Sequence, residues 1–293
     1  MIVQATPDML PALIKIWVVA FGDPPAHIEF IFDNLLSPAD ILVKVDDRGS
    51  PAATLVTKEV RFISGGQSFA GAYVMGVATL PKHRGKGYAS ALVQEADVRL
   101  KAAGRELACL LPANMGLFDF YAARGYHTKF YYKLLEVTGE GIPTDGKGGV
   151  LSPALLEDLA ALRAKAFAGS ALFGEWDADF LRYHGKECRF FGGEVLRFSH
   201  GGGQGYLVCY PKNPSTILVK EAVLPGGEVE PLLTALHARY RAKNYQIRLP
   251  SDLSIPEKWG ARTLPFGMVK WYDETLPQKI AGGAPWFALG LDD

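Results

Sequence analysis

A basic turn with two glycines is the part of this sequence whose residue types and spacing could do chemistry. It reads Arg84-Gly85-Lys86-Gly87-Tyr88-Ala89, follows the apolar stretch Val77-Ala78-Thr79, and precedes a helical pattern. Glycines let successive backbone amides point into one concavity, and the helix that follows adds unpaired N–H groups and the positive end of its dipole. Because Arg84 and Lys86 add positive charge, the segment predicts a cradle for a phosphate or pyrophosphate; the alternative is a solvated basic turn.

Three kinds of phosphate cradle can be compared with this turn. A P-loop requires Gly-x-x-x-x-Gly-Lys-Ser/Thr, which Gly85-Lys86-Gly87 does not supply. A dinucleotide-binding turn requires its glycines directly after a strand, whereas residues 81–84 separate the strand from Gly85, and no acid ends the next strand. The pattern Arg/Gln-x-x-Gly-x-Gly/Ala fits residues 84–89 completely.

A second patterned segment follows the helix. It contains Leu111-Pro112-Ala113-Asn114, then Phe118 and Tyr121, and then Gly125-Tyr126. Phe118, Tyr121 and Gly125 share one face of a helix, so spacing alone favours Tyr121 as a core aromatic residue.

The two segments together resemble the motifs of the GNAT superfamily of N-acetyltransferases, most strongly over residues 70–137. The stretch from Gly76 to Ala89 is similar to the branch named for enhanced intracellular survival, which carries tandem acetyltransferase folds. The resemblance implies acetyl-CoA as co-substrate and direct attack on its thioester by a primary amine of a small-molecule or peptide acceptor. This branch often assembles through its second domain, so a homo-oligomer is an open expectation.

The resemblance also implies roles for individual residues. The backbone of Val77 and Thr79, together with Asn114, would hold the pantetheine arm; a backbone N–H near Val77 or Ala78 would stabilise the oxyanion. Tyr121 would lie near the sulfur as the proton donor. The implied cofactor-binding residues are Val77, Ala78, Thr79, Arg84, Gly85, Lys86, Gly87, Tyr88, Ala89 and Asn114.

The sequence does not identify a general base. Asp23, Glu29 and Asp33 lie in the early helical region where this family shapes its acceptor site, but each also fits a solvated surface acid. In the resembled branch a terminal carboxylate enters the active site, brought there by a third, sterol-carrier-like domain. This sequence shows no such domain, so that role is not expected of Asp293. His83 is expected to be an exposed turn residue.

The chain of 293 residues is divided by a glycine-rich segment at residues 139–149. Both halves open with a hydroxyl-proline pair, Thr6-Pro7 and Ser152-Pro153, followed by apolar residues at helical spacing. The repeat predicts a duplication. The expected fold class is α/β (α+β), with two tandem GNAT-like domains at residues 1–138 and 150–293, each a mixed, mostly antiparallel sheet flanked by helices.

The second half departs from the family pattern. Gly226-Gly227-Glu228-Val229-Glu230 has acids where the first turn has bases, and Asp252 stands in the place of Asn114. Carboxylates near a helix start would repel a pyrophosphate. We therefore expect a degenerate second domain that binds no coenzyme A and walls the acceptor pocket. The run Gly201-Gly202-Gly203 is expected to be a hairpin turn.

Composition excludes several classes of function. Basic and acidic residues balance at 31 each, which gives no electrostatic footprint for nucleic acid or an anionic membrane. Three scattered cysteines are typical of reduced thiols in a cytoplasmic protein. The six histidines show no metal-ligand spacing, so no metal is expected.

Three functions remain open at this point. The main hypothesis is an acetyl-CoA-dependent N-acetyltransferase. The alternative is a catalytically idle acyl-CoA-binding regulatory module, which needs the cradle but not Tyr121. A third is a nucleotide-binding oxidoreductase that uses the near-match glycines.

Overall fold

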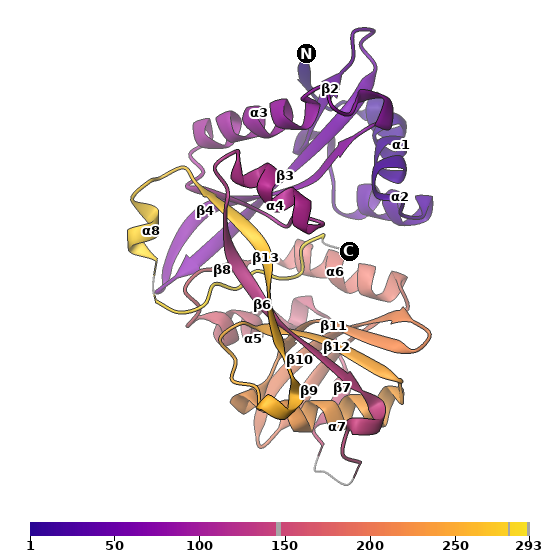
Figure 1. Ribbon diagram of the computed structural model, residues 1–293, viewed down its shortest axis with the longest axis vertical. Coiled ribbons are helices and arrows are strands. Elements are labelled where there is room, and N and C mark those ends of the chain that lie inside the picture. Colours follow the sequence, from indigo (N-terminus) through magenta and orange to yellow (C-terminus); the bar gives the residue numbers. More distant parts are fainter. Residues whose placement is uncertain (145–147, 281, 292–293) are drawn as a thin grey trace.

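The computed structural model describes residues 1–144, 148–280 and 282–291. Its strands form one mixed, mostly antiparallel sheet with helices packed against it (Figure 1), which is the fold class that the sequence predicted. The strands are β1 (Ile2–Gln4), β2 (Ile41–Val45), β3 (Pro51–Ser64), β4 (Gln67–Thr79), β5 (Leu107–Leu110), β6 (His127–Thr138), β7 (Val150–Pro153), β8 (Phe173–Glu175), β9 (Glu194–His200), β10 (Gly203–Asn213), β11 (Thr216–Val223), β12 (Asn244–Pro250) and β13 (Arg262–Trp271). The helices are α1 (Leu10–Phe21), α2 (Pro25–Asn34), α3 (Tyr88–Ala102), α4 (Met115–Ala122), α5 (Ala160–Phe167), α6 (Ala178–Phe190), α7 (Val229–Tyr240) and α8 (Leu276–Lys279).

The strand order shows that the two halves of the chain share the sheet. The order is β1-β2-β3-β4-β5-β13-β6-β12-β11-β10-β9-β7, and β8 pairs with β3 outside this path. Strand β13, from the end of the chain, therefore lies between β5 and β6 of the first half (Figure 1). Strand β6 in turn pairs with β12 of the second half. Each half thus supplies a strand that the other needs.

A partly buried carboxylate fixes β13 to the first half. Asp97 of α3 accepts hydrogen bonds from Lys270 Nζ at 2.7 Å and from the hydroxyls of Tyr272 at 2.6 Å and Tyr126 at 3.1 Å. Lys270 also donates to the Arg124 carbonyl at 2.8 Å. Removing β13 would leave these groups without their partners and would expose the edge of β5.

Helix α3 forms where the sequence predicted a helix over about residues 87–103. Its buried face consists of Leu92, Val93, Ala96 and Leu100, which recur at steps of one, three and four and pack on the sheet. The long β3–β4 hairpin closes through Gly65 and Gly66, whose φ values of +54° and +77° suit a two-residue turn. These two elements position the candidate site.

The second half begins differently from the expectation. Ser152-Pro153 ends strand β7, which pairs with β9, and does not start a helix. The helical segment begins at Glu157 as a 3-10 turn and continues as α5. Helix α6 was not expected. The hairpin at Gly201-Gly202 is confirmed, since β9 and β10 are antiparallel neighbours. None of the described helices is long and apolar enough to span a membrane.

Candidate active site

A bulge in β4 shapes the centre of the first half. Gly76 and Val77 together face Leu55 of β3, because Ala78 pairs with Thr54 and Met75 with Val56. Gly76 has a φ of +59°, and a Cβ at this position would lie 2.1 Å from Trp17 Cζ2. Only glycine fits both the backbone and the space.

A short chain of hydrogen bonds holds the bulge in place. The Trp17 indole N–H donates to Thr54 Oγ1 at 3.0 Å, and Thr54 Oγ1 donates to the Gly76 carbonyl at 3.0 Å. Thr54 is fully buried and Trp17 almost so. The direction of β4 beyond the bulge is therefore fixed by α1 and β3 together.

Strand β4 has an unpaired edge beyond Val74. It runs parallel to β5 only from Gly71 to Val74, and β5 ends at Leu110. On its other side β4 stays paired with β3, and the Leu80 N–H donates to the Ala52 carbonyl at 3.0 Å. Because the backbone groups of a strand alternate between its edges, those of Val77 and Thr79 face the open side. Thr79 Oγ1 is buried and has no hydrogen-bond partner among the described residues.

The turn at residues 84–89 forms an open set of donors. Arg84, Gly85, Lys86 and Gly87 are exposed, and space is open where side chains would stand on Gly85 and Gly87. Both glycines have positive φ values, +75° and +77°, and Gly87 is the N-cap of α3. In the described part of the chain, no backbone carbonyl accepts from the N–H groups of residues 85–89. This arrangement can surround an anion.

Arg84, the first residue of the turn, and His83, which precedes it, differ in exposure. The Arg84 side chain reaches back to the Thr79 carbonyl, with Nε at 3.2 Å. His83 was expected to be exposed, and this expectation is wrong: it is 8% exposed, lies 3.6 Å from Asp46 and stacks on Tyr88 at 5.6 Å. The His83 ring is buried because it stacks on Tyr88, the first residue of α3. His83 therefore supports the turn from its buried side.

Tyr121 and Asn114 come from the segment after β5. Asn114 is exposed at the N-cap of α4, and Tyr121 lies on the buried face of that helix. The Tyr121 side chain is 6% exposed, and burial raises its pKa to about 12, although the nearby Arg124 cation acts in the opposite direction. No hydrogen bond contributes to this shift. A hydroxyl with this environment stays protonated at neutral pH and can donate.

A cavity of about 420 Å³ joins Tyr121 to the bulge of β4. Tyr121 and Val77 line it together with apolar side chains from the first half, among them Trp17, Ile28, Ile31, Met75 and Leu117. The second half contributes Glu187, Phe191, Lys220 and Leu291. The cavity is therefore built by both halves. Ala78, Thr79, residues 84–89 and Asn114 do not line it; Ala78 is buried in the sheet, and the turn lies farther along the chain from the same strand.

The polar end of the cavity centres on a buried carboxylate. Glu187 is 3% exposed, accepts from Tyr183 at 2.7 Å and Tyr210 at 3.3 Å, and lies 3.2 Å from His184 Nδ1. Burial acts to raise the pKa of this carboxyl, but the neighbouring imidazoles of His184 and His27 and the Lys220 cation outweigh it and hold the pKa well below its usual range. Glu187 therefore remains an anion.

Sequence reasoning missed several cavity residues. Of the three acids considered, Asp23 lines the cavity, whereas Glu29 and Asp33 are exposed outside it. His27 was not considered, although Pro24-Pro25 marks a helix start that would have placed it on α2. Asp293 lies outside the described residues, but Leu291 lines the cavity and its carbonyl lies 3.3 Å from the Tyr73 hydroxyl.

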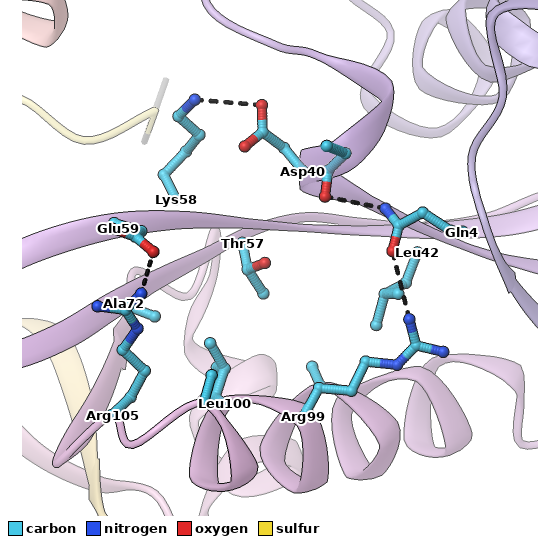
Figure 2. Close-up of a pocket in the computed structure, with 13 residues that line it drawn as sticks. Gln4, Asp40, Leu42, Thr57, Lys58, Glu59, Ala72, Arg99, Leu100 and Arg105 are labelled. Atoms are coloured by element: carbon cyan, nitrogen blue, oxygen red, sulfur yellow. Dashed lines mark hydrogen bonds and ion pairs between the residues drawn. The ribbon is translucent and has the colours of Figure 1, made fainter.

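A second hollow lies between α3 and the edge strands (Figure 2). Its charged side chains are paired: Lys58 with Asp40 at 3.1 Å, Arg105 with Glu59, and Arg99 with Glu95 at 2.7 Å. None of the predicted site residues lines it. Because its charges already satisfy one another, this hollow is a weaker candidate than the cavity beside β4. The described residues contain no group of three or more potential metal ligands.

Comparisons with known proteins agree with this geometry. The family profile of an acetyltransferase (GNAT) domain matches residues 2–128. A GCN5-related N-acetyltransferase from Anabaena variabilis has a similar structure at 15% identity and a TM-score of 0.75, over 93% of this chain and 72% of that one. No curated protein matches the chain.

Two further solved structures are similar. A protein from Enterococcus faecalis, described as a probable N-acyltransferase, has 14% identity and a TM-score of 0.70, over 93% of this chain and 73% of that one. Eis1 from Mycobacterium abscessus has 17% identity and a TM-score of 0.67, over 93% and 74% of the two chains. At these identities the likeness concerns the fold, and it extends over both halves.

Proposed function

Because residues 2–128 match the family profile of an acetyltransferase (GNAT) domain, we propose that this chain transfers an acetyl group from acetyl-CoA to a primary amine. The observation that carries the proposal is the unpaired edge of β4. It runs from the cavity that holds Tyr121 directly into the turn whose N–H groups lack backbone partners. A thioester at the bulge would then lie between Tyr121 and the amine, with its pyrophosphate at residues 84–89.

The residues that would hold acetyl-CoA are those predicted from the sequence. The backbone of Val77 and Thr79 would pair with the pantetheine arm in the way that a further strand pairs with an edge. The N–H groups of residues 85–89 and the charges of Arg84 and Lys86 would bind the pyrophosphate. Asn114 would face the pantetheine from the start of α4.

The reaction needs a neutral amine, a stabilised oxyanion and a protonated thiolate. The amine nitrogen attacks the carbonyl carbon, a C–N bond forms, and the C–S bond breaks. The Val77 N–H, on the open edge of β4, would stabilise the oxyanion. The Tyr121 hydroxyl would give its proton to the sulfur and recover one from the nitrogen, so that the tyrosine is unchanged after each turnover.

The second half has a structural part in this proposal. We infer two tandem GNAT-like units, residues 1–138 and 150–293, that exchange strands and build the acceptor cavity between them. The three buried, unpaired cysteines support a reducing, cytoplasmic setting. Tyr121, placed in the same cavity as the open edge, favours an enzyme over an idle acyl-CoA-binding module.

A thermal-shift titration with acetyl-CoA tests the proposal. A ligand that binds only the native state adds about 2.7 kcal/mol of stability at 100 times its Kd, so the melting temperature of the wild type rises. Arg84→Glu should remove the rise because it puts an anion beside the pyrophosphate. Lys101→Glu reverses a charge at the far end of the same helix and should keep it. No rise in the wild type, or an equal rise in Arg84→Glu, would overturn the proposal.

A further inference from the structure

The acceptor amine must lose a proton before it can attack, and the proposed function does not say where that proton goes. A lysine-like amine has a pKa of about 10.4, so only about one molecule in a thousand is neutral at pH 7. The titratable side chains that line the cavity are Asp23, His27, Glu187, Lys220 and two tyrosines, Tyr73 and Tyr121.

Most of these groups are unsuited to accept the proton. Glu187 is a buried anion whose oxygens already take hydrogen bonds from two tyrosines. Burial raises the pKa of Tyr121 to about 12, which makes its neutral hydroxyl a donor. Lys220 is 7% exposed and lies over the ring of Tyr210 at 4.9 Å, where it neutralises part of the charge of Glu187. Asp23 is 45% exposed, so water solvates its carboxylate.

His27 has the geometry of a base held by an acid. Its Nε2 lies 3.6 Å from Glu187 Oε1, and its Nδ1 lies 4.0 Å from Asp23 Oδ1. Both ring nitrogens are buried, and neither has a hydrogen-bond partner within the described part of the chain. Phe190 stacks on the ring at 6.1 Å and Phe191 meets it edge-on at 4.6 Å. Buried polar atoms without partners call for a ligand or a water.

We propose that His27 is the proton acceptor for the acceptor amine and that Glu187, from the second half, is the residue that positions it. Histidine is the residue type whose side chain exchanges protons between pH 5 and 8. If His27 Nε2 carries its proton toward Glu187, the lone pair of Nδ1 is left for the substrate. Glu187 then orients the base, as the third group of a catalytic triad does. This inference rests on the proposed function of the cavity.

The proton balance of the step is simple. The ammonium group gives one proton to Nδ1 of His27 and becomes a neutral amine; the imidazolium, which lies between the carboxylates of Asp23 and Glu187, later returns that proton to solvent. The second proton of the nitrogen passes to the sulfur through Tyr121. The charged groups around His27 are Asp23 and Glu187 directly, and His184 and Lys220 through their contacts with Glu187.

Two amines of the same size test the proposal. 2-Phenylethylamine is a cation at neutral pH, whereas O-benzylhydroxylamine is neutral, and the aromatic body of each suits a cavity walled by Trp17 and Phe191. In His27→Gln, kcat/KM at pH 7 should fall about 100-fold for the cation and less than about 3-fold for the neutral amine. The defect for 2-phenylethylamine should shrink as the pH rises, because solvent then removes the proton.

Matched variants separate His27 from its surroundings. His184→Gln removes another imidazole that contacts Glu187 but does not line the cavity; it should leave the ratio of the two amines at its wild-type value. Glu187→Gln should change that ratio in the same direction as His27→Gln, but less. All three variants should keep the thermal shift produced by acetyl-CoA, which shows that they fold and bind it.

A direct readout covers the case in which catalysis is slow. The ¹⁵N NMR resonances of the His27 ring should shift when 2-phenylethylamine is added to the complex with coenzyme A. An unchanged spectrum, or equal losses for both amines in His27→Gln, would overturn the proposal. If acetyl-CoA binds but the wild type acetylates no amine, the proposed function fails, and the NMR result still decides whether His27 meets the amine.

Discussion

The turns after β4 and after β11 occupy corresponding places in the two halves and differ in chemistry. Each follows a strand that pairs in parallel with the next strand over four residues, and each places two left-handed glycines before a helix. The first turn then presents Arg84 and Lys86, whereas the second presents Glu228 and Glu230. Glu228 pairs with His200 at 3.1 Å, and Glu230 pairs with Lys258. Paired glycines therefore redirect a chain from strand to helix without making a phosphate site.

The strands that lead into these turns differ even more. Beyond its parallel pairing, β4 lines an open cavity, whereas β11 is buried over Glu221 to Val223. Glu221 accepts from Arg163 Nε at 3.0 Å and Nη2 at 3.1 Å, from the Trp286 indole at 3.2 Å, and from the Tyr206 hydroxyl. The space that could hold a pantetheine arm in the first half is filled by a buried ion pair in the second. The proposed function therefore predicts that coenzyme A binding requires both an open strand edge and a basic turn.

The largest expected effect comes from breaking that ion pair. Glu221→Leu should lower the free energy of unfolding by about 3–5 kcal/mol, because it leaves Arg163 buried without its counter-ion. Arg163 is 2% exposed, and although burial alone would lower its pKa, the carboxylate of Glu221 raises it. Urea unfolding measures the change.

The double variant Arg163→Met/Glu221→Leu is the control for this prediction. It removes both charges and should recover part of the lost stability, while the hydroxyl of Tyr206 and the indole of Trp286 stay unpaired. If Glu221→Leu lowers the free energy of unfolding by less than about 1 kcal/mol, the Arg163–Glu221 ion pair does not fill the space in the second half as described.

The next largest effect concerns a group that only the first half has. Tyr121→Phe should lower kcat by about 10- to 100-fold and leave the acetyl-CoA thermal shift unchanged, because the hydroxyl acts on the leaving sulfur. Between β12 and β13, a stretch that the structure describes throughout, the second half has no α-helix to carry such a tyrosine; a short 3-10 turn at Glu257–Trp259 lies there instead. A turnover rate equal to that of the wild type would exclude Tyr121 as the proton donor.

The same variant has a signature in alkaline stability. Burial raises the pKa of Tyr121 to about 12, above the value near 10 of an unfolded chain. The native state holds this proton more tightly, so the stability that it contributes is fully present below about pH 10 and is lost as the pH rises toward about 12. Between pH 9 and 11.5, the wild type should lose about 2 kcal/mol more than Tyr121→Phe. Equal losses would mean that the hydroxyl is not shielded from water.

The smallest effect tests whether charge alone separates the two turns. Glu228→Lys/Glu230→Lys gives the second turn basic residues, but the ion pair behind it remains. Calorimetric titration with coenzyme A should still find one site per chain. Stability should change by less than about 1 kcal/mol, since the lost pairs with His200 and Lys258 are partly exposed. A second equivalent of bound coenzyme A would show that an open edge is not required.

The local sequence pattern was sufficient to predict the elements on either side of the turn at residues 84–89. Leu92, Val93, Ala96 and Leu100 mark one face of α3, and Gly87 marks its start, so both were readable along the chain. Reasoning from local pattern was wrong at Ser152-Pro153, where it predicted the start of a helix. The segment instead forms β7, which pairs with β9 at the end of the sheet. Helix α6 had a readable signal that was missed: Asp177 caps it by accepting from the Phe180 N–H at 2.8 Å.

The sequence by itself determined the chemistry of the first turn, because glycines with positive φ, the adjacent bases and the helix start are neighbours in the chain. Only the tertiary structure decided which side chains line the cavity where the amine is proposed to bind. His27 and Glu187 come from different halves, and β13 crosses from the end of the chain to lie between β5 and β6. Contacts between residues so distant in sequence depend on how whole elements pack, and hydrophobic period and spacing carry no record of that packing.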